Sequence, residues 1–167
     1  MMATAPDRLA DLQQLEIRAM TDADVRAVVE VERASYQFPW SEGIFRDCLR
    51  VGYVCRVVLS CDELIGYGIM STGSGEAHIL NLCVREVDRC RGVGRTLLEY
   101  LLARAGAGGS SEAYLEVRPS NTPAIRLYQT LGFEPIGIRR GYYQAVGGRE
   151  DAAVLRLSLR NRRFHHG

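Results

Sequence analysis

The chain of 167 residues has the length of one folded domain, and its hydrophobic content of 47% is sufficient to fill a core. Its 21 basic residues, all of them arginine, face 20 acidic residues, so a net charge of +1 gives no overall attraction to nucleic acid or to a membrane surface. The sequence has no apolar signal core near its start and no uncharged stretch long enough to span a bilayer, so we expect a cytoplasmic protein.

Cysteine and histidine usage gives no sign of a metal site or a disulfide framework. The cysteines contain no CxxC pair, and their odd number favours the reduced thiols of a cytosolic protein. The histidines have no suitable metal-binding partners in the sequence, so we predict no metal. The cysteines are Cys48, Cys55, Cys61, Cys83 and Cys90, and the histidines are His78, His165 and His166.

In chain order, the first half of the sequence predicts one strand, two helices and three further strands. Thr21 is a candidate N-cap, and the helix after it keeps its valines near one face. Pro39 interrupts helical structure, and Ser41 can cap a short second helix. The predicted strands are 15–20, 53–59, 64–71 and 78–84, and the last is mostly apolar, which is typical of a strand buried on both faces.

In the second half a glycine turn leads into a long helix, and Gly132 closes a later helix. Strands and helices are mixed without a sustained βαβ alternation, so we predict a single mixed-sheet α/β domain. The predicted elements are a helix at 93–105, a strand at 113–117, a helix at 121–131 and strands at 133–139 and 151–159. The domain at 15–159 follows an extension at 1–14 and precedes a basic tail at 160–167. The tail is expected to be solvated, and the alternative is that it helps the protein approach ribosomal RNA or a basic assembly intermediate.

The segment RCRGVGR, residues 89–95, places two glycines and three arginines between a strand and the long helix. A helix N-terminus offers free backbone N–H groups, and glycines let a phosphate approach the backbone. A tight connection with solvated arginines explains the turn equally well. Named nucleotide motifs fit poorly, because the last glycine of GxGxxG is missing and Arg89 and Arg95 replace the first glycine and the lysine of a P-loop.

The pattern Arg89-x-x-Gly92-x-Gly94 resembles the pyrophosphate-binding motif of the GCN5-related N-acetyltransferases. The resemblance covers residues 15–159 and is most specific for the bacterial ribosomal-protein alanine N-acetyltransferases. It implies an α/β (α+β) domain with a mixed, mostly antiparallel sheet, a splay between two central strands and flanking helices. The other stretches that carry it are FPWSEGIF, LEVRPSNTPAIRLYQTLGF and RRGYYQAVGGREDA.

The same resemblance implies acetyl-CoA as the cosubstrate. In that family the pantetheine arm pairs with strand backbone at the positions of Leu82, Cys83 and Val84, and Asn121 also meets the cofactor. Cys83 as an acyl-carrying nucleophile is a weaker reading, because no histidine partner is suggested and a buried structural thiol explains it better. The pyrophosphate is implied to lie on Arg89, Arg91, Gly92, Val93, Gly94 and Arg95.

Glu116 stands in the apolar run AYLEV, where burial of a carboxylate costs several kcal/mol unless it is paired or hydrated. From the residues alone, a pair with Arg118 on the same strand face explains it slightly better than catalysis does. The resemblance instead implies that Glu116 is the general base. A desolvated carboxylate with a raised pKa would accept, directly or through water, the proton that an α-ammonium of pKa ~7.7–8.0 must lose.

Tyr128 lies with Ala124, Leu127 and Leu131 at helical spacing, and that spacing alone indicates a core tyrosine. The resembling enzymes place at this position the hydroxyl that faces the departing CoA sulfur as general acid. Because a thiol has a pKa of ~8.5 and a tyrosine of ~10, a strong hydrogen bond to the sulfur describes this role as well as full donation does.

Further aromatic and acidic residues are candidates for binding the acceptor. By residue type alone, Trp40, Tyr142 and Tyr143 are expected to be core or surface aromatics. The resemblance implies instead that they lie at the rim of an acceptor groove. Glu150 and Asp151 are available to attract a cationic substrate, although a solvated turn explains them equally well.

The sequence therefore predicts an acetyl-CoA-dependent Nα-acetyltransferase, in which the amine attacks the thioester directly within a ternary complex. By resemblance, the acceptor is the N-terminal alanine of small-subunit ribosomal protein eighteen, with no nucleic-acid or membrane partner required. One alternative is an acetyltransferase for lysine side chains or a small amine. Another is a non-catalytic acyl-CoA-binding sensor, against which the joint presence of Glu116, Asn121 and Tyr128 argues.

Overall fold

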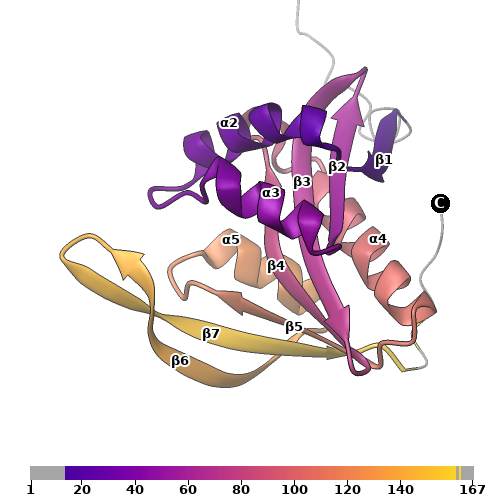
Figure 1. Cartoon of the computed structure of the whole chain (residues 1–167). Coiled ribbons are helices and arrows are strands. Elements are labelled where there is room, and N and C mark those ends of the chain that lie inside the picture. The colour runs from indigo at the N-terminus through magenta and orange to yellow at the C-terminus, as the bar shows by residue number, and fades with distance from the viewer. Residues whose placement is uncertain (1–13, 161, 163–167) are drawn as a thin grey trace, which may run out of the picture. The chain divides into compact units, whose positions relative to one another are not determined.

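The computed structural model describes residues 14–160 and 162. The predicted extension before Gln14 and most of the predicted basic tail lie outside the described residues. Within the described part, no helix combines the length and the apolar character needed to cross a membrane. In chain order the elements are β1 (Leu15–Ala19), η1 (Asp22–Asp24), α2 (Val25–Ser35), α3 (Glu42–Arg50), β2 (Val54–Ser60), β3 (Glu63–Gly73), β4 (Glu76–Val84), η2 (Glu86–Asp88), α4 (Val93–Ala107), β5 (Glu112–Val117), α5 (Thr122–Thr130), β6 (Glu134–Ala145) and β7 (Gly148–Ser158) (Figure 1).

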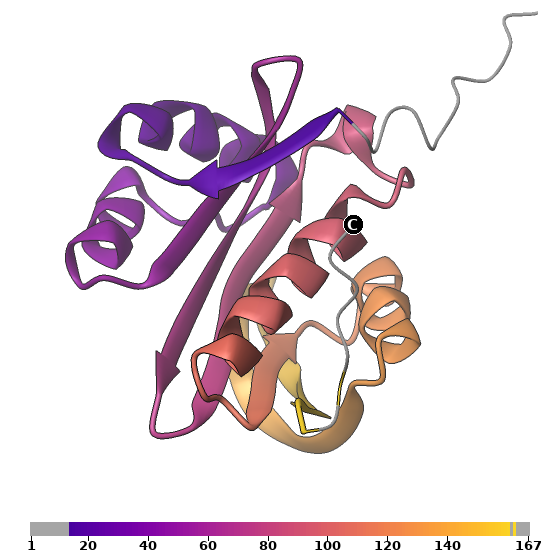
Figure 2. The same cartoon turned by 90° about the vertical axis from the view of Figure 1, so that its right-hand side faces the viewer.

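The seven strands form one sheet in the order β1-β2-β3-β4-β5-β7-β6. β1 pairs antiparallel with β2 (Figure 2), and β7 pairs antiparallel with both β5 and β6. β4 and β5, which α4 connects, run parallel in a ladder that extends from Glu76 opposite Glu112 to Ile79 opposite Leu115. The ladder therefore ends before either strand does, as the predicted splay requires. This mixed sheet agrees with the predicted fold class.

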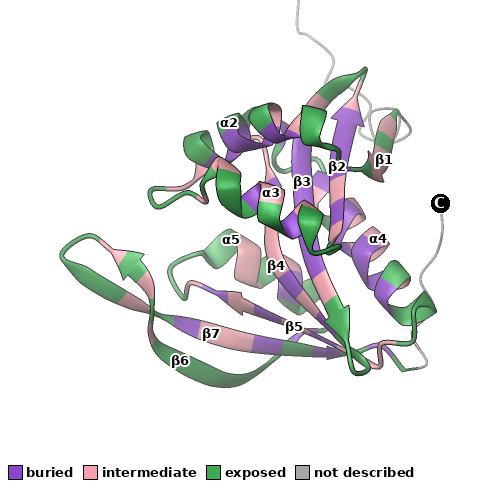
Figure 3. Ribbon diagram, in the orientation of Figure 1, coloured by how far each residue is buried: buried purple, intermediate pink, exposed green. Residues whose placement is uncertain are grey.

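The described residues divide into two compact units. The first contains the described residues up to Ile69 together with Asn81–Leu98. In it, α2 and α3 lie on one face of β2 and β3, and these strands are largely buried (Figures 1 and 3). The core of this unit includes Val25, Val28, Val29, Phe45, Val57, Val58, Ile65, Tyr67 and Ile69.

Capping residues explain where the helices of the first unit begin. The Ser41 hydroxyl accepts a hydrogen bond from the backbone N–H of Ile44 at 3.3 Å, so α3 begins where the sequence predicts. Thr21 instead precedes the 3-10 helix η1, where the N–H of Asp24 donates to the carbonyl of Thr21 at 3.0 Å. Helix α2 then begins at Val25, one turn later than the predicted cap implies.

The second unit contains Met70–Leu80 and the described residues from Glu99 onward. Its strands β6 and β7 form a long hairpin, and β6 is mostly exposed (Figure 3). Helix α5 begins after Asn121, whose side-chain oxygen accepts a hydrogen bond from the N–H of Ala124 at 3.3 Å. The core of this unit includes Leu101, Leu102, Ala113, Leu115, Leu131, Phe133, Leu155 and Leu157.

The last two strands are longer than the sequence predicts. They extend toward each other, to Glu134–Ala145 and Gly148–Ser158, and leave a turn of Val146 and Gly147. Gly147 has a φ of +76°, a conformation that favours glycine in a two-residue hairpin turn. The predicted strands, 133–139 and 151–159, left a broad turn at 140–150. Tyr142, Tyr143 and Glu150, which this prediction placed in the turn, and Asp151 beside it therefore lie on paired strands.

Strand β4 also differs from the prediction that it is buried on both faces. Buried residues such as Ala77 and Ile79 alternate with half-buried residues such as His78 and Leu82. Since side chains alternate between the two faces of a strand, β4 has one buried face and one partly exposed face. The sequence of this strand is mostly apolar, so it could not show which face is buried.

Candidate functional site

The turn before α4, in the first unit, contains a glycine with a positive φ at the start of the helix. Gly92 has a φ of +81°, which residues with side chains rarely adopt. Its carbonyl accepts the first hydrogen bond of the helix, from the N–H of Thr96 at 3.0 Å. The N–H groups of the first helical turn, from Val93 on, have no acceptor inside the helix and suit a phosphate.

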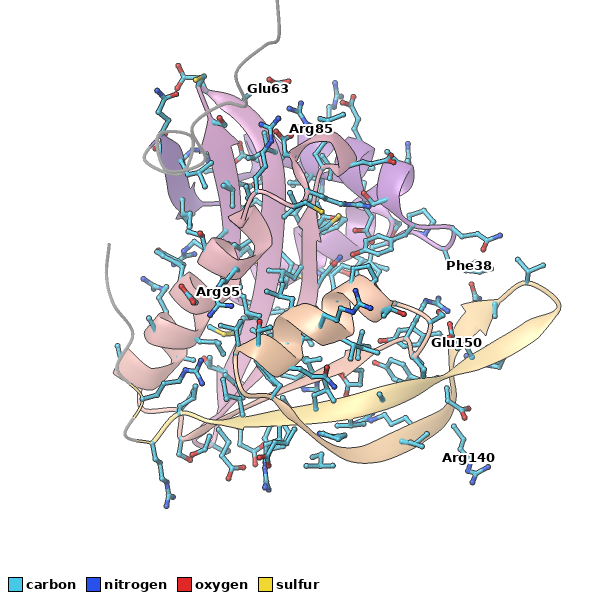
Figure 4. All side chains as sticks on the ribbon, turned by 180° about the vertical axis from the view of Figure 1, so that it is seen from behind. Phe38, Glu63, Arg85, Arg95, Arg140 and Glu150 are labelled. Atoms are coloured by element: carbon cyan, nitrogen blue, oxygen red, sulfur yellow. The ribbon has the colours of Figure 1, made fainter. Side chains whose placement is uncertain are left out.

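Two arginines of this turn contact neighbouring groups of the first unit. The Arg89 Nε donates to the carbonyl of Val84 at 2.9 Å. Arg91 Nη1 lies 3.8 Å from the carboxylate of Asp88 and is half-exposed. Arg95 follows on α4 (Figure 4). The turn therefore gathers guanidinium groups at a helix N-terminus, which fits the charge of a diphosphate.

Arg85 connects the start of this turn to β3. Its guanidinium pairs with the buried Asp88 and with Glu63, each at 2.6 Å, and the Arg85–Glu63 pair is visible in Figure 4. Its backbone N–H donates to the carbonyl of Ile65 at 2.7 Å. These contacts hold the polypeptide in place immediately before the glycine turn.

Two carbonyls of the predicted pantetheine segment already accept side-chain hydrogen bonds. The hydroxyl of Tyr36 donates to the carbonyl of Leu82 at 3.2 Å, and Arg89 binds that of Val84. A carbonyl oxygen has two lone pairs, so each can still accept a second donor. Cys83 between them is a buried thiol, 4% exposed, in agreement with a structural role.

Trp40 is anchored by a buried carboxylate that the sequence did not reveal. Glu32, on α2, is only 2% exposed, and its Oε1 accepts the backbone N–H of Trp40 at 3.1 Å. Its Oε2 accepts the side-chain amide of Asn81 at 3.1 Å and the hydroxyl of Tyr67. The Trp40 ring packs on Phe45 with 5.4 Å between the ring centroids.

In the second unit, Glu116 is paired with His78. The His78 Nε2 lies 2.6 Å from the Glu116 Oε2, and the Arg139 Nε lies 3.4 Å from the Oε1. The side chain of Glu116 is 7% exposed, whereas that of His78 is 33% exposed. The alternative that Glu116 pairs with Arg118 is therefore wrong, because Arg118 binds Glu150 at 3.1 Å.

Strand pairing explains the choice of partner. His78 lies opposite Tyr114 in the parallel ladder, and Glu116 follows Tyr114 by two residues, so all three side chains point to one face of the sheet. Diagonal neighbours on adjacent strands are within reach of long side chains. The strand register thus selects His78 for Glu116.

The prediction of a raised pKa for Glu116 is wrong. Burial alone would raise the pKa of this carboxyl, but the hydrogen bond and charge of His78, together with the charge of Arg139, lower it below its ordinary value. Glu116 is therefore ionised at neutral pH. A carboxylate with a lowered pKa is also a weaker base than the sequence suggested.

Tyr128 has the core packing that its helical spacing indicates. It lies on α5 with 9% of its surface exposed, and its ring makes an edge contact with Phe133 at 5.8 Å between centroids. Its general-acid role and the cofactor contact of Asn121, which caps the same helix, stay predictions.

Three residues predicted to bind the acceptor belong to a network around Arg118. The Arg118 guanidinium lies 4.4 Å from the centroid of the Tyr143 ring and pairs with Glu150, which lies on β7 (Figure 4). Glu150 also accepts the backbone N–H and the hydroxyl of Ser120, at 3.2 and 3.1 Å. The ring of Tyr142, 4.8 Å from that of Tyr143, completes the group.

Asp151 stabilises an irregularity in β6. Its Oδ1 accepts the backbone N–H of Gly141 at 2.8 Å, within the stretch from Arg139 to Tyr143 where the register with β7 shifts. Glu150 and Asp151 thus lie on a paired strand and have hydrogen-bond partners, so the reading of this region as a turn is wrong, although Asp151 is exposed to solvent. Whether they also bind a substrate stays a prediction.

The predicted site residues fall into two groups, one in each unit. Sequence reasoning missed Glu32 and His78. Glu32 could have been found from the sequence, because it is a carboxylate on the valine-lined face of a helix. The pairing of His78 with Glu116 could not, because the two residues are far apart in the sequence. The first unit holds Trp40, Leu82, Cys83, Val84, Arg89, Arg91, Gly92, Val93, Gly94 and Arg95, and the second holds Glu116, Asn121, Tyr128, Tyr142, Tyr143, Glu150 and Asp151. No cluster of three or more metal-ligating side chains occurs among the residues that the structure describes.

Comparison with protein families matches residues 12–133 to the Acetyltransferase (GNAT) family. The chain is 34% identical over 143 residues to the ribosomal protein bS18-alanine N-acetyltransferase of Escherichia coli strain K12, covering 86% of this chain and 97% of that enzyme. The same enzyme of Haemophilus ducreyi is 34% identical over 144 residues, with coverage of 86% and 99%.

Solved structures agree with this relationship. The ribosomal-protein-S18-alanine N-acetyltransferase from Escherichia coli superimposes with a TM-score of 0.81 and 32% identity, covering 90% of this chain and 99% of that one. Ard1 from Thermoplasma volcanium superimposes with a TM-score of 0.80 and 25% identity, covering 87% and 97%. These similarities confirm the predicted fold.

Proposed function

Because the chain belongs to the GNAT family and is therefore an acetyl-CoA-dependent N-acetyltransferase, we propose that its acceptor is the N-terminal alanine of ribosomal protein bS18. The observation that carries this proposal is the similarity to the E. coli bS18-alanine enzyme over 97% of that enzyme's length. A protein N-terminus, presented in the cytoplasm, is thus the proposed substrate class.

The chemistry of an α-amine supports the same acceptor. At pH 7 an α-amine of pKa ~7.7–8.0 is roughly one-tenth neutral, whereas a lysine of pKa ~10.4 is almost wholly charged. Removal of the proton costs about 3.4 kcal/mol more for the lysine. An enzyme whose buried carboxylate has a lowered pKa is poorly equipped to supply that difference.

The proposal gives each group of residues a task. When bound, acetyl-CoA supplies the activated acetyl thioester. The turn 89–95 holds its diphosphate through backbone N–H groups and arginines, and the backbone at 82–84 holds its pantetheine arm. Glu116 acts on the proton of the amine, and the hydroxyl of Tyr128 donates toward the leaving sulfur. Trp40, Tyr142, Tyr143, Glu150 and Asp151 bind the acceptor peptide.

Two peptides test the acceptor. One copies the N-terminus of bS18, begins with alanine and has no lysine. In the other the α-amine is blocked and one internal lysine is free. We expect kcat/KM with acetyl-CoA to be higher for the alanine peptide by tenfold or more, because less free energy is needed to expose its nucleophile. Equal values, or a preference for lysine, would overturn the N-terminal assignment in favour of the side-chain alternative.

A substitution in the glycine turn tests where CoA binds. We expect Gly92→Val to weaken CoA binding at least tenfold, because valine disfavours the positive φ of Gly92 and its side chain obstructs the approach of a phosphate. Calorimetry with CoA measures the change. Gly109→Val is a matched control, since Gly109 also has a positive φ, of +94°, at the far end of α4. A folded Gly92→Val protein with unchanged CoA affinity would contradict the assignment.

A further inference from the structure

The paired side chains of His78 and Glu116 suggest a division of labour that deepens the proposed function and rests on it. We infer that the imidazole of His78 takes up the proton from the substrate amine at its Nδ1, and that Glu116 holds the imidazole in the orientation and tautomer needed for this. His78 is then the catalytic base, and Glu116 acts through it.

The contacts of Glu116 favour the ionised form of its carboxyl group and so disfavour its protonation. Its Oε2 is 2.6 Å from the His78 Nε2, and its Oε1 is 3.4 Å from the Arg139 Nε. Both oxygens of the carboxylate therefore face donors. The carboxylate is also nearly buried, whereas a third of the imidazole surface is exposed. Of the two groups, the imidazole is the one that a substrate or a water molecule can reach.

The tautomer of His78 follows from the same contact. An ionised carboxylate only accepts hydrogen bonds, so the His78 Nε2 must carry the hydrogen that lies between it and Glu116. In the neutral imidazole the Nδ1 is then unprotonated and is an acceptor. This is the arrangement by which a carboxylate orients a histidine base in other enzymes.

Proton affinity also favours an imidazole. The reference pKa of an imidazole, ~6.5, lies about 1.3 units below that of an α-ammonium, so transfer between them is unfavourable by only about 20-fold. For a carboxyl group of reference pKa ~4.3 the same transfer is unfavourable by several thousand-fold. The contacts that lower the pKa of Glu116 increase this disadvantage.

The groups around His78 come from three strands. β5 supplies Glu116 and, directly opposite in the ladder, Tyr114, whose hydroxyl is bonded to Glu112. β6 supplies Arg139 at the far oxygen of Glu116. On its own strand, Glu76 lies two residues away and is exposed. The stretch of β3 in this unit, 70–73, has no titratable side chain.

The proton balance of the reaction closes with these residues. The α-ammonium gives one proton to the His78 Nδ1, and the neutral amine then forms the C–N bond as the C–S bond of the thioester breaks. The nitrogen releases its second proton to water as the sulfur takes a proton from the Tyr128 hydroxyl, and the tyrosinate then regains a proton from water. His78 finally releases its proton to water, so the net products are the amide, the free thiol and one proton.

Substitution of His78 by glutamine separates proton transfer from positioning, because the glutamine amide can still donate to Glu116 but cannot take up a proton. We expect His78→Gln and His78→Leu both to lower kcat at pH 7 by about 10²-fold or more. We also expect the kcat of His78→Gln to rise with pH up to the pKa of the bound amine, which must then lose its proton unaided. Tyr114→Phe, a change directly opposite His78, should leave kcat within threefold.

The inference would be overturned if the His78→Gln enzyme kept kcat within threefold of the wild type and its kcat depended on pH below neutrality as that of the wild type does. Glu116 would then be the base. A second measurement is independent of activity. In the ¹⁵N-labelled full chain, with His78→Gln used to assign the signals, we expect the neutral His78 ring to carry its proton on Nε2. A neutral ring protonated on Nδ1 would also overturn the inference. The proposed acceptor is tested with the wild-type enzyme and two peptides. A failure of that proposal can therefore be distinguished from a failure of the inference about His78.

Discussion

Glu116→Gln is expected to lower kcat for the alanine peptide by about 10²–10⁴-fold while the affinity for CoA stays within threefold. The carboxylate either takes the proton of the amine or stabilises the imidazolium of His78, 2.6 Å away, and a neutral amide does neither well. The measurement is steady-state kcat at saturating peptide and acetyl-CoA, together with calorimetry of CoA binding. A fall in kcat without a fall in affinity identifies a group needed during the chemical step.

The matched control is Glu112→Gln. Glu112 lies on the same strand and points to the same face as Glu116, four residues away, where its carboxylate accepts the hydroxyl of Tyr114. This variant should keep kcat within threefold. If Glu116→Gln also kept its kcat, Glu116 would be a structural residue with no part in the chemical step.

Because the pKa of Glu116 is lowered, its contribution to the free energy of unfolding should depend on pH. A carboxyl group whose pKa is lower in the folded state than in the unfolded chain stabilises the fold above its unfolded pKa of ~4.3, and this contribution is lost as the pH falls through the lowered value. The Gln variant should therefore unfold at lower urea concentration than the wild type at pH 7. The difference between the two proteins should shrink as the pH falls below about 4.

Glu32→Leu is expected to reduce the free energy of unfolding by about 3 kcal/mol or more. Leucine is similar in size but leaves the Trp40 N–H, the Tyr67 hydroxyl and the Asn81 amide without their acceptor. An unsatisfied buried donor costs about 1–3 kcal/mol, and such costs are not strictly additive within one network. Urea unfolding at pH 7 gives the change from the transition midpoint.

Glu30→Leu is the control for Glu32→Leu. Glu30 is on the same helix but exposed, so its replacement should change the free energy of unfolding by no more than about 0.5 kcal/mol. If Glu32→Leu were as stable as the wild type, the hydrogen bonds of Glu32 would not contribute to the fold. Activity of a folded Glu32→Leu protein on peptides would further test whether the anchoring of Trp40 matters for the acceptor.

Features that depend on residues close in the chain could be predicted from the sequence. Ser41 caps α3 and the glycine turn precedes α4, as predicted, since each involves atoms within about one helical turn. The mixture of strands and helices without a sustained βαβ alternation also predicted the mixed α/β class. The family resemblance added acetyl-CoA and the candidate site residues, whose individual roles stay predictions.

Strand ends were less predictable. The strand β6 is mostly exposed, so its side chains lack the hydrophobic alternation by which a strand is recognised, and its pairing with β7 sets its length. Local sequence therefore placed a broad turn where the protein has a hairpin with a turn of two residues, Val146 and Gly147.

The partner of Glu116 was decided only by tertiary structure. Along a strand, Arg118 is on the same face as Glu116 but about 6.6 Å farther on, at 3.3 Å per residue. His78 is a diagonal neighbour of Glu116 across the β4–β5 ladder, at about 7–8 Å, a separation that long side chains still bridge. Spacing along the chain alone therefore does not choose between the two partners. The parallel register that sets His78 opposite Tyr114 therefore gave Glu116 an imidazole, left Arg118 to Glu150, and lowered a pKa that the sequence alone suggested would be raised.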